Sequence, residues 1–416
     1  MTRLRRASDQ AEAGLPSACR IALAAGCALA LLSFGLRGTF GLFTAPLSEA
    51  RGWDREVFAV AVAIQNLAWG IGQPLAGIAA DRWGASRVVA LGGLLYAAGL
   101  AAAPFADTPL LLHLSVGVLT GLGMGGASYI TVMAAIGRMA PEAKRSWALG
   151  VATAAGSLGQ FIVVPLGQAL ISAYGWNIAF LLLAAMGAAM PLLALGLRGD
   201  VPPEQPQTDM QELERGSWAI IADAFRLPSY RLLVAAFFVC GFQLAFITIH
   251  MPPWLADLGL DPSVAALGIA LVGLFNVAGA YAAGVLGARR SRRLLLAGIY
   301  LGRALAVAVF VSLPVTPVTV MIFCSVMGAF WLSTAPLTSG LVAVFFGTRH
   351  LATLFGIAFL SHQLGSFLGV WLGAAIVSAT GSYDMAWWLS ALLGIAAALL
   401  HLPIREVPAT SRVRFA

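Results

Sequence analysis

The stretch Gly77-Ile-Ala-Ala-Asp81-Arg82-Trp83-Gly84-Ala-Ser-Arg87 separates two long apolar runs and carries charges of both signs. The run before it, 56–79, and the run after it, 87–105, are each long enough to cross a bilayer as a helix. A short charged loop between two such runs predicts a helical hairpin whose loop lies at the membrane surface.

The composition of the whole chain is that of a membrane protein. Its 416 residues are 60% hydrophobic and only 10% charged, whereas a soluble domain carries about 25% charged residues. A soluble domain, a disordered chain and a nucleic-acid-binding protein are therefore excluded. The 46 glycines suit close contact between membrane helices. The runs are apolar on all sides, which favours helices over a barrel of alternating strands.

Twelve apolar runs follow one another along the chain, with Pro and Gly at the breaks between them. We therefore expect an all-α membrane protein with twelve transmembrane helices. Their expected ranges are 21–46, 56–79, 87–105, 110–135, 147–171, 177–197, 230–253, 263–287, 294–313, 317–342, 352–378 and 384–402.

The basic residues predict the orientation of these helices. Of the 25 Lys and Arg residues, all but Arg37, Arg51, Arg55 and Arg303 fall in segments on the side of the N-terminus. Because basic loops stay in the cytoplasm, we expect both termini to be cytoplasmic, in a cell (inner) membrane. The loop 198–229 is the longest polar stretch and should link two halves, 1–197 and 230–416, with a short interfacial helix.

The two halves repeat each other at a nearly constant distance. With a shift of 207, Gly52, Asp54 and Gly77 fall on Gly259, Asp261 and Gly284. With a shift of 206, a second block aligns, in which Gly150, Gly159, Phe161, Gly167 and Gly175 meet Gly356, Gly365, Phe367, Gly373 and Gly381. Six helices per half give both repeats the same orientation, a pattern typical of transporters with a central site between the halves.

The loop 77–87 resembles the Gly-x-x-x-Asp-Arg-x-Gly-Arg-Arg loop of the major facilitator superfamily. Ala85 and Ser86 replace the basic pair of that motif, and the second copy, 284–293, lacks its aspartate. Together with twelve spans and the repeat, the resemblance covers nearly the whole chain. It implies two parallel six-helix bundles that rock about a central site, with Asp81 and Arg82 acting in the coupling between states.

Within the superfamily, the end of the first span resembles the bacterial monocarboxylate and oxalate/formate-type branch. The residues that carry this likeness are Phe40-Gly41-Leu42-Phe43-x-x-Pro46-Leu47, followed by Gly52-Trp53-Asp54-Arg55. The branch often has an Asp/Arg pair in the eighth span for proton-coupled transport. Here that span has only Asn276 as a strong polar group.

The charged and polar residues inside the expected spans point to an anionic substrate. Asp and Glu lie outside the spans or at span ends, as Glu56 and Asp384 do, whereas Arg37 and Arg303 lie inside spans. A charge at this depth is costly and should face water or a partner, and a guanidinium binds a carboxylate through two parallel hydrogen bonds. We expect substrate contacts from Arg37, Asn66, Gln243, Asn276 and His362. Interhelical hydrogen bonding is the alternative role for the polar ones.

A second set of residues is expected to act in coupling or gating. Asp81 and Arg82 belong to it by the resemblance above. His250 lies at the end of the seventh span, where a gate or cap is expected, and Arg303 lies in the ninth span, which is peripheral in this superfamily. A clamp between helices or a side chain reaching the interface is the alternative for Arg303.

The sequence thus predicts a secondary transporter that moves a small organic anion by alternating access. A monocarboxylate is the favoured substrate. A co-transported proton is a candidate partner, and a monomer is expected. A broad-specificity drug or metabolite exporter of the same fold is the first alternative, and a non-transporting membrane sensor is the second. No nucleotide motif, catalytic pair or metal-ligand spacing is present, so no cofactor, metal or enzymatic activity is expected.

Overall fold

The structure is a computed structural model that describes residues 16–199, 217–347 and 351–408. In these ranges the regular structure is helical, and eleven helical segments are long and apolar enough to cross a membrane. One of them, Trp147–Leu197, spans 51 residues and changes direction at Gly175, whose φ is 79°. It therefore supplies two crossings, and the twelve expected spans are confirmed to within a few residues at their ends.

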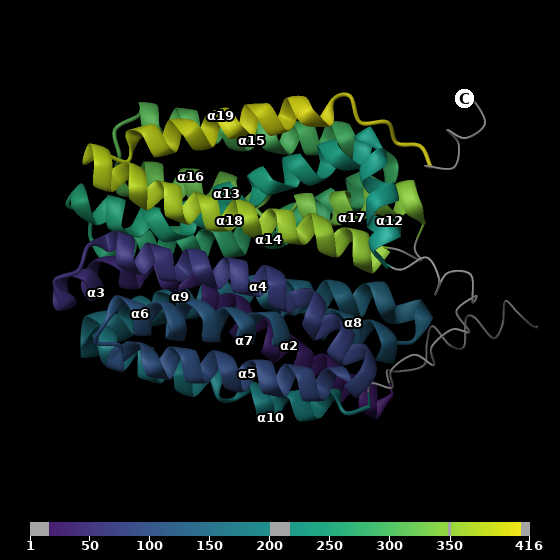
Figure 1. The fold of residues 1–416 in the computed structure, drawn as a ribbon, viewed down its shortest axis with the longest axis horizontal. Coiled ribbons are helices and arrows are strands. Elements are labelled where there is room, and N and C mark those ends of the chain that lie inside the picture. The colour runs from purple at the N-terminus through teal and green to yellow at the C-terminus, as the bar shows by residue number, and fades with distance from the viewer. Residues whose placement is uncertain (1–15, 200–216, 348–350, 409–416) are drawn as a thin grey trace, which may run out of the picture.

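The N-terminal half forms one bundle, which runs from purple to blue-teal in Figure 1. Its α-helices are α2 (Ser17–Gly38), α3 (Thr44–Arg51), α4 (Arg55–Trp83), α5 (Ala85–Ala102), α6 (Pro109–Leu112), α7 (Thr120–Gly126), α8 (Tyr129–Met139), α9 (Glu142–Gly187) and α10 (Met190–Ala194). Four short non-α helices join them: η1 (Phe40–Phe43), η2 (Ala103–Phe105), η3 (His113–Leu119) and η4 (Leu195–Leu197).

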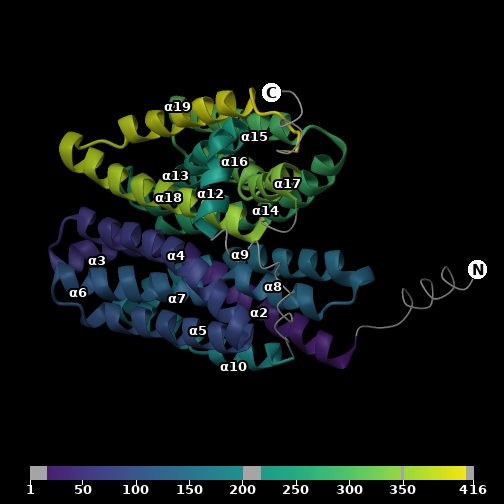
Figure 2. The same cartoon turned by 45° about the vertical axis from the view of Figure 1, so that its right-hand side comes forward.

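The C-terminal half forms a second bundle, green to yellow, beside the first (Figures 1 and 2). Its helices are α12 (Ser217–Arg226), α13 (Pro228–Asp257), α14 (Pro262–Arg289), α15 (Arg292–Ser312), α16 (Pro317–Phe330), α17 (Thr334–Phe346), α18 (Leu351–Thr380) and α19 (Asp384–His401). The short helix α12 lies in the linker between the halves.

Equivalent turns in the two halves have the same geometry. Gly52 and Gly259 both adopt a positive φ, 64° and 77°, which glycine reaches without steric cost. Two residues later, Asp54 caps α4 by accepting a hydrogen bond from the Glu56 N–H, at 2.9 Å. Asp261 caps α14 in the same way. Its hydrogen bonds with Ser263 lower the pKa of Asp261. The sequence repeat is therefore a structural repeat.

Equivalent glycines also bring helices together in each half. A Cβ on Gly159 of α9 would collide with the Leu31 carbonyl of α2, and one on Gly365 of α18 would collide with the Phe238 carbonyl of α13. Gly159 and Gly365 are 206 positions apart, which is the shift that relates the two halves. Only a residue without a side chain permits such backbone approach, as in small-residue contacts between membrane helices.

The two bundles meet along a seam where α4 packs on α18 and α9 packs on α14. We call the end of the bundle where α4 and α14 begin the Arg55 end, and the end where they finish the Arg82 end. Glycines on the seam helices contact the other half near mid-depth, as Gly70 contacts Gln363. Nearer the Arg82 end, a Cβ would meet only open space at Gly77, Gly150, Gly284 and Gly356. Hydrogen bonds between the halves, such as those of Arg55 with Asp257 and of Gln363 with Asn66, close the seam at the Arg55 end and near mid-depth.

Candidate substrate site

Arg37 lies in the last turn of α2, deep in the N-terminal bundle. Its side chain is partly exposed, and its guanidinium carbon lies 4.7 Å from the ring centroid of Trp69 on α4, a cation–π contact. Within the described part of the chain, the guanidinium forms no hydrogen bond or ion pair. All five of its N–H donors therefore remain available to a ligand.

An aromatic row continues from Arg37 across the seam. The edge of the Trp69 ring meets Phe359 of α18, with centroids 5.3 Å apart. Phe359 in turn stacks on the imidazole of His362, at 5.8 Å and an interplanar angle of 6°. Arg37 and His362, both expected at the substrate site, are thus joined by two aromatic rings from opposite halves.

The same region holds a hydrogen-bonded link between α18 and α4. Nδ1 of His362 lies 3.0 Å from Oε1 of Gln363, and Nε2 of Gln363 donates to the carbonyl of Asn66, at 3.3 Å. The Asn66 side chain donates to the Val62 carbonyl of its own helix. Asn66 and His362 therefore lie close together, with Asn66 contributing its backbone to the contact.

Asn276 joins three elements across the seam. Its Nδ2 donates to Oγ of Ser157 on α9, at 2.9 Å, and its Oδ1 accepts from the N–H of Leu332, also at 2.9 Å. Leu332 lies in the break between α16 and α17. Beside it, Nε2 of Gln160 donates to the Ile269 carbonyl of α14, at 3.0 Å. These contacts hold the halves together in this state.

Gln243 is placed differently from the other expected substrate residues. It is fully buried, and its Nε2 donates to the Ser390 carbonyl of α19, at 3.0 Å. Its Oε1 has no partner within the described residues. Gln243 thus links α13 to the outer helix α19, and its side chain turns away from the seam.

Arg303 on α15 is fully buried and clamps the break in the tenth span. Its Nη2 donates to the carbonyls of Phe330 and Trp331, and its Nη1 contacts Sγ of Cys240, at 3.3 Å. These carbonyls end α16 and have no partner in their own helix. A cation is favourable at such a helix C-terminus.

His250 lines a small cavity of about 190 Å³ at the Arg55 end. Its Nε2 lies 2.8 Å from the Val370 carbonyl of α18, and its ring faces that of Tyr383. Thr44, whose buried hydroxyl has no partner within the described residues, also lines the cavity. The imidazole thus lies directly beneath the closed end of the seam.

Asp81 and Arg82 lie at the opposite end and are largely exposed. The Asp81 carboxylate lies 3.6 Å from the Arg138 guanidinium of α8, in the same half. Arg82 lies over the neighbouring Trp83 ring, at 6.0 Å. In this state, then, the described contacts of the loop are within one bundle, and a contact of Asp81 with the other half stays a prediction for the opposite state.

The ion pair of Arg55 and Asp257 joins the two halves and is a contact that the sequence reasoning missed. Nη1 and Nη2 of Arg55 donate to the two oxygens of the Asp257 carboxylate in the opposite half, at 2.6 and 2.7 Å. Ser378 of α18 also donates to Asp54, at 3.3 Å. The signal available in the sequence was the position of Arg55, one of only two basic residues in the loops on this side of the membrane.

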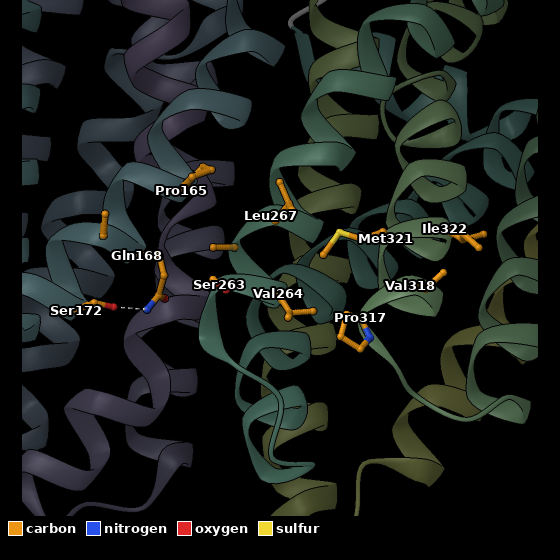
Figure 3. A pocket seen from close by; sticks show the side chains of 12 residues that line it. Pro165, Gln168, Ser172, Ser263, Val264, Leu267, Pro317, Val318, Met321 and Ile322 are labelled. Carbon is orange, nitrogen blue, oxygen red and sulfur yellow. Dashed lines mark hydrogen bonds between the residues drawn. The ribbon is translucent and has the colours of Figure 1, made fainter.

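A larger groove lies away from these groups. It has a volume of about 680 Å³ and lies between α9 and the helices α14 and α16 (Figure 3). Its lining holds Gln168 and Ser172 but no charged side chain, so it offers no partner for an anion. The described residues also contain no cluster of His, Cys, Asp or Glu suited to a metal ion.

The fold and the apolar helices are those of a multi-pass membrane protein. The family model of the Major Facilitator Superfamily matches residues 25–370. The chain belongs to this superfamily. Its function is therefore that of a transporter and not of an enzyme.

Individual relatives place the chain near the monocarboxylate branch. It is 26% identical over 356 residues to the "Uncharacterized MFS-type transporter YcxA" of Bacillus subtilis, covering 83% of this chain and 85% of that one. It is 26% identical over 385 residues to Monocarboxylate transporter 13 of Rattus norvegicus, covering 89% and 86%. The crystal structure of a D-xylose-proton symporter shares the fold, with a TM-score of 0.68, 19% identity, and 94% and 97% coverage.

Proposed function

We propose that this protein carries a small monocarboxylate across the membrane and that Arg37 binds its carboxylate. The observation that carries the proposal is the free guanidinium of Arg37, partly exposed and deep in the first span. A cation at this depth requires an aqueous surrounding or an anionic partner, and the carboxylates of the protein lie outside the spans or at their ends. A substrate carboxylate would supply the missing partner through a bidentate contact.

The surroundings of Arg37 favour a short organic anion. Trp69 and Phe359 offer apolar faces beside the guanidinium, which suits the carbon skeleton of a monocarboxylate. His362, at the far end of the aromatic row, offers a hydrogen bond for a hydroxyl or keto group. The relatives named as monocarboxylate transporters support the same substrate class.

The cycle we propose is a rocking of the two bundles about this site. Since nearly all basic residues lie on one side, the Arg82 end faces the cytoplasm and both termini are cytoplasmic, in the cell (inner) membrane. In this cycle, the conformation described here is open to the inside. On the outside it is closed by the ion pair of Arg55 and Asp257, below which the small cavity lies. Asn276 and Gln160 hold the closed seam, and Asp81 acts when the Arg82 end closes. A monomer suffices for this cycle.

Uptake and counterflow in proteoliposomes test the proposal. Labelled acetate, lactate and pyruvate are compared with succinate and with a lipophilic cation, with and without a pH gradient. Saturable counterflow of a monocarboxylate is expected. Transport of the cation without any carboxylate transport would contradict the proposal and indicate the drug-exporter alternative.

A further inference from the structure

Cys240 of α13 lies at the centre of a buried polar cluster beside the substrate site. Its Sγ lies 3.3 Å from Nη1 of Arg303 on α15 and 3.3 Å from the hydroxyl of Thr334 at the start of α17. The imidazole of His362 on α18 also lies beside the thiol. The residue is only 1% exposed, so these contacts are not shared with bulk water.

The charge of Arg303 makes this thiol unusual. Arg303 is 0% exposed, and its remaining hydrogen bonds go to the neutral carbonyls of Phe330 and Trp331. Among the described residues, Cys240 is the one side chain to which Arg303 donates. A buried cation needs a counter-charge, and an adjacent guanidinium generally favours the thiolate of a cysteine.

The other titratable groups that face Cys240 come from three further elements. Tyr300 of α15 is fully buried, and its hydroxyl has no hydrogen-bond partner within the described residues. His362 faces the thiol from α18, and Arg37 of α2 interacts with it electrostatically from across the seam. Among the described residues, the cluster thus contains the guanidinium groups of Arg303 and Arg37, the thiol of Cys240, one imidazole and one phenol, and no carboxylate.

We propose that Cys240 is the proton-binding group of the transport cycle, a thiolate paired with Arg303 that takes up one proton when a carboxylate binds at Arg37. This inference rests on the function proposed above and names the coupling residue of that site. The step is R–S⁻ + H⁺ → R–SH. The proton comes from water in the opened seam and returns to water after the substrate anion has left.

The physical reason is repulsion between two anions in a medium of low dielectric constant. A carboxylate placed at Arg37 raises the proton affinity of a nearby thiolate, as one carboxylate does for another in a shared site. By linkage, protonation of Cys240 strengthens anion binding by the same factor by which the bound anion strengthens proton binding to Cys240. The anion and the proton then cross together, without the membrane carboxylate that such coupling would otherwise use.

His362 is the competing proton site, and the structure distinguishes the two by their partners. Nδ1 of His362 lies against Gln363 Oε1 and the ring stacks on Phe359, so these two partners of His362 are uncharged, whereas Cys240 lies against the guanidinium of Arg303. Cys324 provides a matched control, because it is equally buried in the same half, but its one hydrogen bond to a described residue goes to the sulfur of Met251, at 3.8 Å.

The first measurement needs no substrate. Ultraviolet absorbance of the thiolate is recorded against pH for purified wild-type protein, Cys240→Ser and Cys324→Ser. We expect a titrating thiolate signal at neutral pH that Cys240→Ser removes and Cys324→Ser retains. A signal absent from wild-type protein, or unchanged in Cys240→Ser, overturns the proposal whatever the substrate is.

The second measurement records proton uptake with a pH-indicator dye when lactate is added to weakly buffered protein. We expect about one proton per bound lactate in wild-type and Cys324→Ser, none in Cys240→Ser, and restored uptake in Cys240→Asp, which returns a titratable anion beside Arg303. Uptake that persists in Cys240→Ser but disappears in His362→Gln assigns the proton to His362 and overturns the proposal. If the thiolate signal is present but lactate, acetate and pyruvate do not bind, the proposed function is wrong. The coupling role of Cys240 is then wrong as well, because it requires a bound carboxylate.

Discussion

Arg55 and Asp257 form a two-point ion pair across the seam, with Nη1 and Nη2 of Arg55 each within 2.7 Å of a carboxylate oxygen. The two residues lie 202 positions apart in the sequence and in different halves. Their side chains are 32% and 43% exposed, so water screens the attraction. An exposed pair contributes about 0.2–1 kcal/mol, which is enough to bias an equilibrium between two states without locking it.

We expect Arg55→Ala to shift the protein toward the state that is open at the Arg55 end. A loss of about 1 kcal/mol corresponds to a roughly fivefold change in the ratio of the two states. The measurement is the labelling rate of a cysteine introduced at Val377, which lines the cavity under the pair. The double exchange Arg55→Asp with Asp257→Arg should restore the wild-type rate. Equal labelling in wild-type and Arg55→Ala would show that the pair does not act as a gate.

The spans and the repeat could be predicted because both depend on the hydrophobicity and the identity of residues at known positions, which the sequence gives directly. Long apolar runs and the positions of Gly52 and Gly259 fix where the helices begin, and local backbone geometry follows from them. The partners of Gln243 and Cys240 could not be predicted. In a helix that is apolar on all sides, nothing in the sequence sets which face meets which neighbour, so Gln243 was expected at the seam but faces α19.

Long-range pairs were missed for a related reason. Arg303 was seen as a costly charge, but its partners are the backbone carbonyls at the end of α16. Any residue type leaves such carbonyls, and the expected span 317–342 gave no sign that a helix ends at Phe330. The candidate site was therefore predictable as a set of polar residues at mid-depth, while its geometry depended on how the two bundles meet.

Close backbone contacts predict a matched set of glycine substitutions. Gly159→Ala and Gly365→Ala place a methyl group against the carbonyls of Leu31 and Phe238, and overpacking of this kind costs about 1–3 kcal/mol. Gly150→Ala and Gly356→Ala, on the same two helices, meet open space. We expect the first pair to lower the thermal unfolding temperature in detergent and the second pair to leave it unchanged or slightly raised. Equal effects in all four variants would contradict the packing described here.

Glu406 anchors the segment after α19 to the start of α15. Its Oε1 accepts hydrogen bonds from the Ser291 hydroxyl and from the Arg293 N–H, the latter at 2.9 Å. Burial opposes ionisation of this carboxyl, but the hydrogen bonds prevail and lower the pKa of Glu406. The stabilisation is therefore complete above the ordinary glutamate pKa and is lost as the pH falls through the lowered value.

We expect Glu406→Gln to reduce the unfolding temperature at pH 7 and the difference from wild type to shrink below about pH 4, near the ordinary pKa of glutamate. Glu49→Gln is the control, since the described residues offer its carboxylate no hydrogen bond. A difference that is constant from pH 7 to the acid range would mean that the charge of Glu406 does not hold this segment.

The strongest test of the site concerns Arg37, because its guanidinium has a neighbour in Trp69 but no described hydrogen-bond partner. Lysine retains the positive charge but cannot reproduce the planar two-point contact with a carboxylate. We therefore expect Arg37→Lys to weaken lactate binding about tenfold or more, at roughly 1.4 kcal/mol per factor of ten, and Arg37→Ala to abolish it. Lactate should also raise the unfolding temperature of wild-type protein, by linkage, and this shift should vanish in Arg37→Ala.

Arg20→Ala serves as the control, because Arg20 is an exposed arginine on the same helix, and this variant should retain the shift. Should Arg37→Ala keep near-normal affinity for the anion, the carboxylate does not bind on the first span and the site must be sought elsewhere along the seam.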